Sequence, residues 1–146
     1  MPLTNHLTNL TAAACIAAIA PLSATAQDAA SFSLELNNAA DTAEGGCRLT
    51  YVAANRSGQA LAAVSYQVAV FDAQGIVTDL LVLEFGDLTD GKTKVVQFDL
   101  GGRGCADISR ITVNEVADCS LADGTMGDFC LSTLETGSRG TIQFGI

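Results

Sequence analysis

The stretch AAVSYQVAVFDAQGIVTDLLVLEF, residues 62–85, decides the fold of this chain. In its first half an apolar side chain occupies every second position, which is the period of a β-strand and not that of a helix. These positions are Val64, Tyr66, Val68 and Val70. The sequence DAQG at 72–75 then turns the chain into a second apolar run, 76–85. Two such runs joined by a short turn that ends in Gly predict a β-hairpin.

The period of two continues on both sides of this hairpin. Runs at 31–37 and 47–55 precede it, and runs at 94–100, 108–116 and 141–146 follow it. The side chains expected to face inward are Phe32, Leu34 and Leu36 in the first run, Cys47, Leu49 and Tyr51 in the second, and Val96, Phe98 and Leu100 in the run at 94–100. Segment 131–137 fits an eighth strand or a helical turn. We therefore predict an all-β fold, an antiparallel β-sandwich of about seven strands.

Residues 1–26 have the layout of a cleavable signal peptide. Their apolar run, 11–22, suits a signal h-region and is too short to cross a bilayer as a helix. Ala24 and Ala26 give the A-x-A pattern that precedes a cleavage site, so residues 27–146 are expected to form one mature domain in the periplasm or outside the cell. A rival interpretation takes 12–15 (AAAC) as a lipobox, in which Cys15 would carry a lipid anchor.

The chain is acidic, with a formal net charge of −9, and no charged residue of types Asp, Glu, Lys or Arg lies in 1–26. A surface of this sign repels polyanions and anionic lipids. We therefore expect no nucleic-acid partner and no membrane insertion after signal cleavage.

Four cysteines remain in the mature chain, and an even number in an exported protein predicts two disulfides. They are Cys47, Cys105, Cys119 and Cys130. Sequence alone allows three pairings. We favour Cys119 with Cys130, because the segment 120–129 between them has the composition of an irregular loop, and this leaves Cys47 with Cys105. Zinc is the other use of four thiols, but no C-x-x-C pair starts such a site, so no metal is expected.

Segment 47–100 resembles a known class of domain. A strand that ends VAVFD, followed by AQG and a β residue, and a later turn before a strand that ends QFDL, are similar to the FxLYD-type, immunoglobulin-like domains of exported bacterial proteins. At 89–91 the sequence TDG stands where that family has Pro-Gly. The resemblance implies an immunoglobulin-like sandwich. It carries over no active-site residues, so it leaves the function open.

Few residues in the mature chain offer catalytic chemistry. The only histidine, His6, lies in the signal, so no imidazole remains for a Ser/His/Asp or Cys/His system. Two acidic clusters are candidates for calcium binding or carboxylate-dependent hydrolysis. They are Glu84, Asp87 and Asp90, and Asp118, Asp123 and Asp128. Both coincide with turns, where Asp is common for its hydrogen bonds to the backbone. We predict no catalytic, cofactor-binding or metal site.

These observations predict a non-enzymatic module of the bacterial envelope that acts by contact with an unknown protein partner, in an adaptor or accessory role. Two alternatives stay open. One is a secreted inhibitor that presents the loop 120–129, and the other is a carboxylate-dependent hydrolase or calcium-binding domain. An adaptor should expose an apolar patch or an open sheet edge, whereas an inhibitor should expose a rigid protruding loop.

Overall fold

The computed structural model describes residues 30–146, together with Met1. The predicted cleavage site and Cys15 lie outside the described residues. The elements, in chain order, are β1 (Ser31–Asp41), β2 (Cys47–Arg56), β3 (Leu61–Asp72), β4 (Val77–Leu88), β5 (Thr93–Leu100), the short 3-10 helix η1 (Cys105–Asp107), β6 (Ile108–Leu121), the helical turn α1 (Phe129–Ser132), β7 (Leu134–Ser138) and β8 (Gln143–Gly145). Segment 131–137 thus contains both expected alternatives, because α1 ends in it and β7 begins in it.

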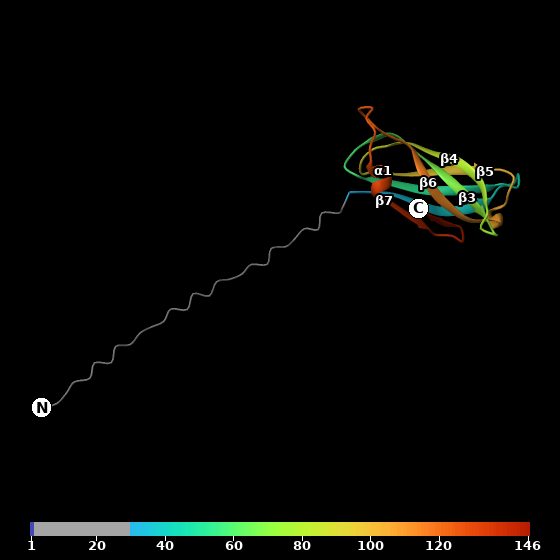
Figure 1. Ribbon diagram of the computed structural model, residues 1–146, viewed down its shortest axis with the longest axis horizontal. Coiled ribbons are helices and arrows are strands. Elements are labelled where there is room, and N and C mark those ends of the chain that lie inside the picture. Colours follow the sequence, from blue (N-terminus) through green and yellow to red (C-terminus); the bar gives the residue numbers. More distant parts are fainter. Residues whose placement is uncertain (2–29) are drawn as a thin grey trace.

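Two sheets of four strands pack face to face (Figure 1). Sheet A has the strand order β5-β2-β1-β7, and sheet B has the order β4-β3-β6-β8. The hairpins β1–β2 and β3–β4 are antiparallel, whereas β7 pairs in parallel with β1, and β8 pairs in parallel with β6. The predicted all-β sandwich with two disulfides is therefore confirmed. It has eight strands, one more than expected, and two of its pairings are parallel.

The core lies between the sheets and uses the alternate positions that the sequence marks. The predicted inward residues of β1, β2 and β3 are all buried, whereas Val96 and Phe98 of β5 are only partly buried. The difference arises because β5 is the edge strand of sheet A. Aromatic rings gather around Tyr51, whose ring centroid lies 5.7 Å from that of Phe85 and 5.0 Å from that of Phe144.

Two buried tyrosines differ in how their hydroxyl groups are satisfied. Tyr66 donates a hydrogen bond of 2.6 Å to the carbonyl oxygen of Cys130, whereas the hydroxyl of Tyr51 has no partner within the described part of the chain. Burial raises the pKa of both phenols, so both stay protonated at physiological pH.

Replacing each tyrosine with Phe is expected to change stability in opposite directions. Tyr66→Phe leaves a buried carbonyl unpaired and should lower the free energy of unfolding by about 1 to 2 kcal/mol. Tyr51→Phe removes a hydroxyl that is buried without a partner and should raise it by about 1 kcal/mol. Urea unfolding of both variants measures the two changes. Equal losses in both variants would contradict the unpaired state of the Tyr51 hydroxyl.

Both disulfides form with the expected pairing. Cys47 at the start of β2 is bonded to Cys105 in η1 across 58 positions, and Cys119 in β6 is bonded to Cys130 in α1 across 11 positions. The first joins sheet A to the segment that leads into sheet B. The second fixes α1 against the end of β6.

Removing the longer bridge is expected to cost more stability than removing the shorter one. In the loop-entropy model, closure of the larger loop contributes about 4 kcal/mol and closure of the smaller about 3 kcal/mol. The double variant Cys47→Ala, Cys105→Ala should therefore lose about 1 kcal/mol more than Cys119→Ala, Cys130→Ala. Guanidinium unfolding of the two variants measures this difference, and the reverse order would contradict the entropic account.

Asn55 at the end of β2 ties the two sheets together at one end of the sandwich. It is fully buried, and its amide nitrogen donates to the carbonyl oxygens of Gln59 at 2.7 Å and Leu88 at 3.0 Å. Its side-chain oxygen accepts from the backbone N–H and the hydroxyl of Ser57. The backbone N–H of Asn55 also donates to the carbonyl oxygen of Lys92 in the β4–β5 turn, and the carbonyl oxygen of Asn55 accepts from the N–H of Gly91. One side chain thus holds the turn after β2 against the end of β4.

Candidate functional site

The first acidic cluster is distributed over separate turns and strands. Asp87 pairs with the ammonium group of Lys94 at 3.2 Å, and this hydrogen bond and charge hold the pKa of the Asp87 carboxyl below its ordinary value. Asp90 accepts a hydrogen bond of 2.9 Å from the backbone N–H of Gly58. Within residues 30–146 no three His, Cys, Asp or Glu side chains gather closely enough to hold a metal ion.

The second cluster is also engaged in local backbone geometry. The carboxylate of Asp123 accepts from the hydroxyl and the backbone N–H of Thr125, and these bonds lower the pKa of Asp123. Asp118 accepts from the hydroxyl of Ser120. Asp128 stands before α1, and its backbone oxygen accepts from the N–H of Ser132. Asp90 and Asp123 thus accept hydrogen bonds from backbone N–H groups in turns, as the sequence suggested.

One acidic pair comes from different predicted clusters. On sheet B, Ser65 of β3 lies between Glu84 of β4 and Asp118 of β6 in the strand register. These residues line a hollow of about 270 Å³ together with Ala63, Val64 and Gly86. Sequence order separates the two carboxylates, and only the sheet register places them near one another.

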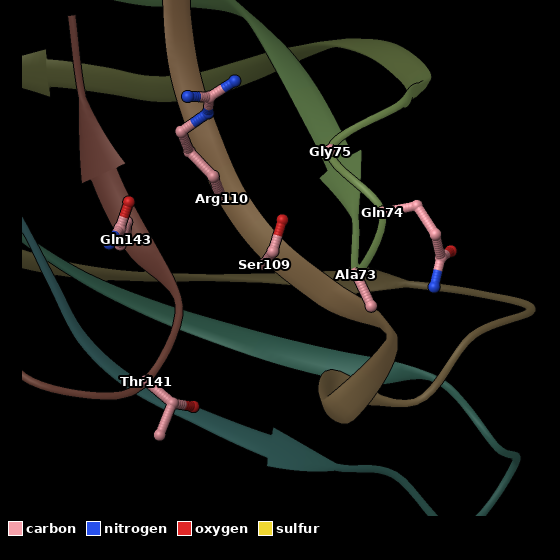
Figure 2. A pocket seen from close by; sticks show the side chains of 7 residues that line it. All are labelled: Ala73, Gln74, Gly75, Ser109, Arg110, Thr141 and Gln143. Carbon is pink, nitrogen blue, oxygen red and sulfur yellow. The ribbon is translucent and has the colours of Figure 1, made fainter.

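A larger hollow, of about 520 Å³, lies beside the β3–β4 turn. Figure 2 shows Ser109 and Arg110 on β6, with Ala73, Gln74 and Gly75 of the turn on one side and Thr141 and Gln143 on the other. The guanidinium carbon of Arg110 lies 3.9 Å from the ring centroid of Phe71, and no ion pair involves Arg110 among residues 30–146. The residues that line this hollow supply hydrogen-bonding groups and one positive charge, that of Arg110.

The most apolar exposed surface runs along β4. Its exposed side chains, called the β4 row below, are Ile76 (62%), Val77 (49%), Leu80 (59%) and Val82 (52%). Leu83, Phe85 and Leu88 of the same strand are buried in the core. Because β4 is the edge of sheet B, the row lies on the outer face of the sheet next to an open strand edge. Large exposed apolar rows of this kind mark interaction surfaces.

The backbone edge of β4 has a strand partner on one side only. β3 pairs with that side, and sheet B places no described strand on the other. Near the start of β4, Arg103 donates to the hydroxyl of Thr78 and forms an ion pair with Asp79 at 2.5 Å. The side of β4 that faces away from β3 therefore has no strand partner among the described residues, and such an edge can accept hydrogen bonds from another strand.

The loop 120–129 forms a second exposed feature. It continues β6 as a tight turn, in which the N–H of Leu121 donates to Thr125 and that of Gly124 donates to Leu121. The Cys119–Cys130 disulfide closes its base. Met126 is 65% exposed, and Figure 1 shows the loop standing out from the sandwich beside α1.

Sequence reasoning assigned the run 76–85 to a strand and missed the β4 row. The signal was present in the four consecutive apolar residues LLVL at 80–83. Such a run places apolar side chains on both faces of a strand, and one of those faces needs a cover beyond the core. In this fold the core covers one face only.

Comparison of the chain with family models, with curated proteins and with solved structures found no match. None of the helices in the described residues is long and apolar enough to span a membrane.

Proposed function

We propose that this chain is a non-enzymatic, exported β-sandwich module that acts by protein contact in the bacterial envelope, as an adaptor or accessory subunit. The observation that carries the proposal is the β4 row beside an open strand edge. An apolar strand edge is a template for strand addition, in which backbone hydrogen bonds and alternate side chains bind a partner. A surface used for contact explains why apolar side chains stay exposed there.

Other properties agree with this role. Two disulfides are characteristic of proteins that fold in oxidising compartments such as the periplasm. The resemblance to FxLYD-type domains of exported bacterial proteins remains part of the proposal, as does the export signal at 1–26. The acidic residues near the turns serve local hydrogen bonds, and those roles need no substrate.

A photo-crosslinking amino acid tests the contact surface in the producing cells. Placed at Val82, it is expected to give covalent adducts in the envelope fraction, because this exposed side chain belongs to the β4 row and lies near the middle of strand β4. The matched control is Gln97, an exposed residue of edge strand β5 in sheet A, which should give none. Adducts from both positions in equal yield, or from neither, would refute a contact role for β4.

The loop 120–129 supports a second candidate, an inhibitor that inserts this loop into an enzyme. The observation that favours it is the exposed Met126 on a turn held by a disulfide. A crosslinker at Met126 distinguishes the two candidates. Adducts from Met126 and none from Val82 would replace the adaptor proposal by the inhibitor.

A further inference from the structure

We propose that the partner at β4 binds with a lysine or arginine side chain, which enters the hollow between Glu84 and Asp118. This inference rests on the proposed contact function and adds the chemistry of the partner. Three observations carry it, which are the burial of Ser65, the two carboxylates beside it, and the position of the hollow next to the β4 row. The hollow, called the Ser65 hollow below, is lined by Ala63, Val64, Ser65, Glu84, Gly86 and Asp118.

The hydroxyl group of Ser65 is buried and has no hydrogen-bond partner. Ser65 is only 7% exposed, although it lies between the core residues Val64 and Tyr66 and therefore faces the outer side of sheet B. Ser109 and Ser120 donate their hydroxyl hydrogens to protein oxygens, whereas Ser65 makes no such bond among residues 30–146. Buried polar groups almost always have a partner. Because Ser65 lines the hollow, a polar group that enters the hollow would supply that partner.

Two carboxylates flank this hydroxyl. Glu84 of β4 and Asp118 of β6 both lie opposite Ser65 in the strand register, one on each side. Paired residues face the same side of a sheet, with Cβ atoms about 4.5 to 5.5 Å apart. The register of β3 shifts at this level against both neighbours, and such bulges change the direction in which side chains point. Two acidic groups therefore border one buried hydroxyl.

Neither carboxylate is neutralised by a cation of the described chain. The ion pairs among residues 30–146 include neither Glu84 nor Asp118. Lys94 lies against Gly86, but its ammonium group is paired with Asp87 at 3.2 Å. The Ser65 hollow thus has two negative charges without a counter-charge, and these attract a positively charged group.

The groups in the hollow suit a cationic side chain better than a metal ion. Calcium takes about six to eight oxygen ligands, and no third His, Cys, Asp or Glu joins the two carboxylates among residues 30–146. An ammonium or guanidinium group only donates hydrogen bonds, and the two carboxylates and the Ser65 hydroxyl oxygen accept them. Ala63 and Val64 add apolar wall, against which the methylene groups of Lys or Arg pack.

The Ser65 hollow lies within reach of a strand that binds at β4. Glu84 follows Val82 by two positions, and both side chains are exposed on the same side of β4. Neighbouring strands lie about 4.8 Å apart, so a long side chain of a strand added beside β4 has to cross only β4 to reach the hollow. Apolar side chains of the same added strand would cover Leu80 and Val82. The partner segment therefore combines apolar residues with one Lys or Arg.

Crosslinking in the producing cells tests the role of the charge. With the photo-crosslinker at Val82, Glu84→Gln should lower the adduct yield about tenfold, because one charge-assisted hydrogen bond is lost. The matched control is Glu115→Gln, which removes the same charge from an exposed position of β6 outside the hollow and should leave the yield unchanged. Both variants should keep the wild-type melting temperature. Equal yields from the two variants would overturn the inference.

A titration of the purified protein tests the chemistry of the hollow without the partner. N-acetyl-argininamide and N-acetyl-lysinamide should shift the amide NMR signals of residues 63–65, 84–86 and 118. N-acetyl-norleucinamide, which lacks the charged group, should leave them in place, and Glu84→Gln should weaken the response to both cationic probes. No shift with either cationic probe would overturn the inference. Calcium chloride that shifts the same signals at a lower concentration than either probe would also overturn it, in favour of a metal site.

Failure of this inference is distinguishable from failure of the proposed function. Adducts at Val82 that persist in the Glu84→Gln variant would end the role of the Ser65 hollow and keep the contact role of β4. A wild-type protein without adducts at Val82 would end the contact role, and the lysine or arginine of the partner would fall with it.

Discussion

Replacing Asn55 with Ala is expected to lower the free energy of unfolding by about 2 to 4 kcal/mol. The reason is that the Asn55 side chain satisfies the carbonyl oxygen of Leu88, which has no access to water, and that of Gln59. Each buried polar group left unpaired costs about 1 to 3 kcal/mol. Chemical denaturation followed by circular dichroism measures the change.

Asn55→Asp provides the matched comparison. It keeps the size of the side chain but sets an acceptor oxygen against the two carbonyl oxygens, so it should destabilise at least as much as the Ala variant at neutral pH. Burial raises the pKa of such a carboxyl in the folded state, so this variant should recover stability as the pH falls through that raised pKa towards the ordinary pKa of an Asp carboxyl. A loss below 1 kcal/mol in both variants would show that the turns hold together without Asn55.

Replacing Phe85 with Ala should lower the free energy of unfolding by about 3 to 5 kcal/mol. Phe85 is 2% exposed and packs edge to face with Tyr51 and Tyr66, at centroid distances of 5.7 Å and 6.1 Å. Its removal would leave a cavity between the sheets, bounded by rings that cannot close it. The thermal midpoint of unfolding should fall accordingly.

Phe98→Ala is the comparison for Phe85. Phe98 also packs on Tyr51 and Phe85, but its strand lies at the edge of sheet A and its ring is only partly buried. A smaller loss is therefore expected, because surrounding water can fill the vacated space. A loss at Phe98 equal to that at Phe85 would mean that the outer part of β5 belongs to the core.

Alternation of apolar residues predicted the central strands well, because side chains two positions apart in a strand face the same side and are buried together. The predicted inward side chains of β1, β2 and β3 all lie in the core. The ends of the strands were harder to predict from the sequence. A bulge between Leu36 and Asn38 lets β1 continue through the polar end of its run to Asp41, where alternation no longer signals a strand.

The carboxyl-terminal strands were the least predictable part of the fold. In β7 only Leu134 is buried, so its sequence carries almost no period. What makes it a strand is parallel pairing with β1, a partner from the other end of the chain. A pattern of neighbouring residues does not contain such distant pairing.

The features of the candidate site also differ in whether the local sequence could predict them. The two disulfides were predicted from the even number of cysteines, and their pairing from the composition of the loop 120–129. The β4 row required knowledge of which strand forms the edge of sheet B, and that depends on the order of strands rather than on any single run. The joining of two turns by Asn55 depends on contacts between sheets, so no local signal marks it.

Strands β7 and β8 follow all other strands in the chain, and this affects the order in which the two sheets can fold. β7 completes sheet A and β8 completes sheet B, and the ion pair between Glu35 and Arg139 joins residues 104 positions apart. Before β7 and β8 have been synthesised, β1 and β6 each lack one of their neighbours. Pairings of such long range are slow to form, and unfinished edges invite aggregation. Until β7 and β8 have paired, each sheet of this protein therefore keeps one more open strand edge than it has in the finished fold.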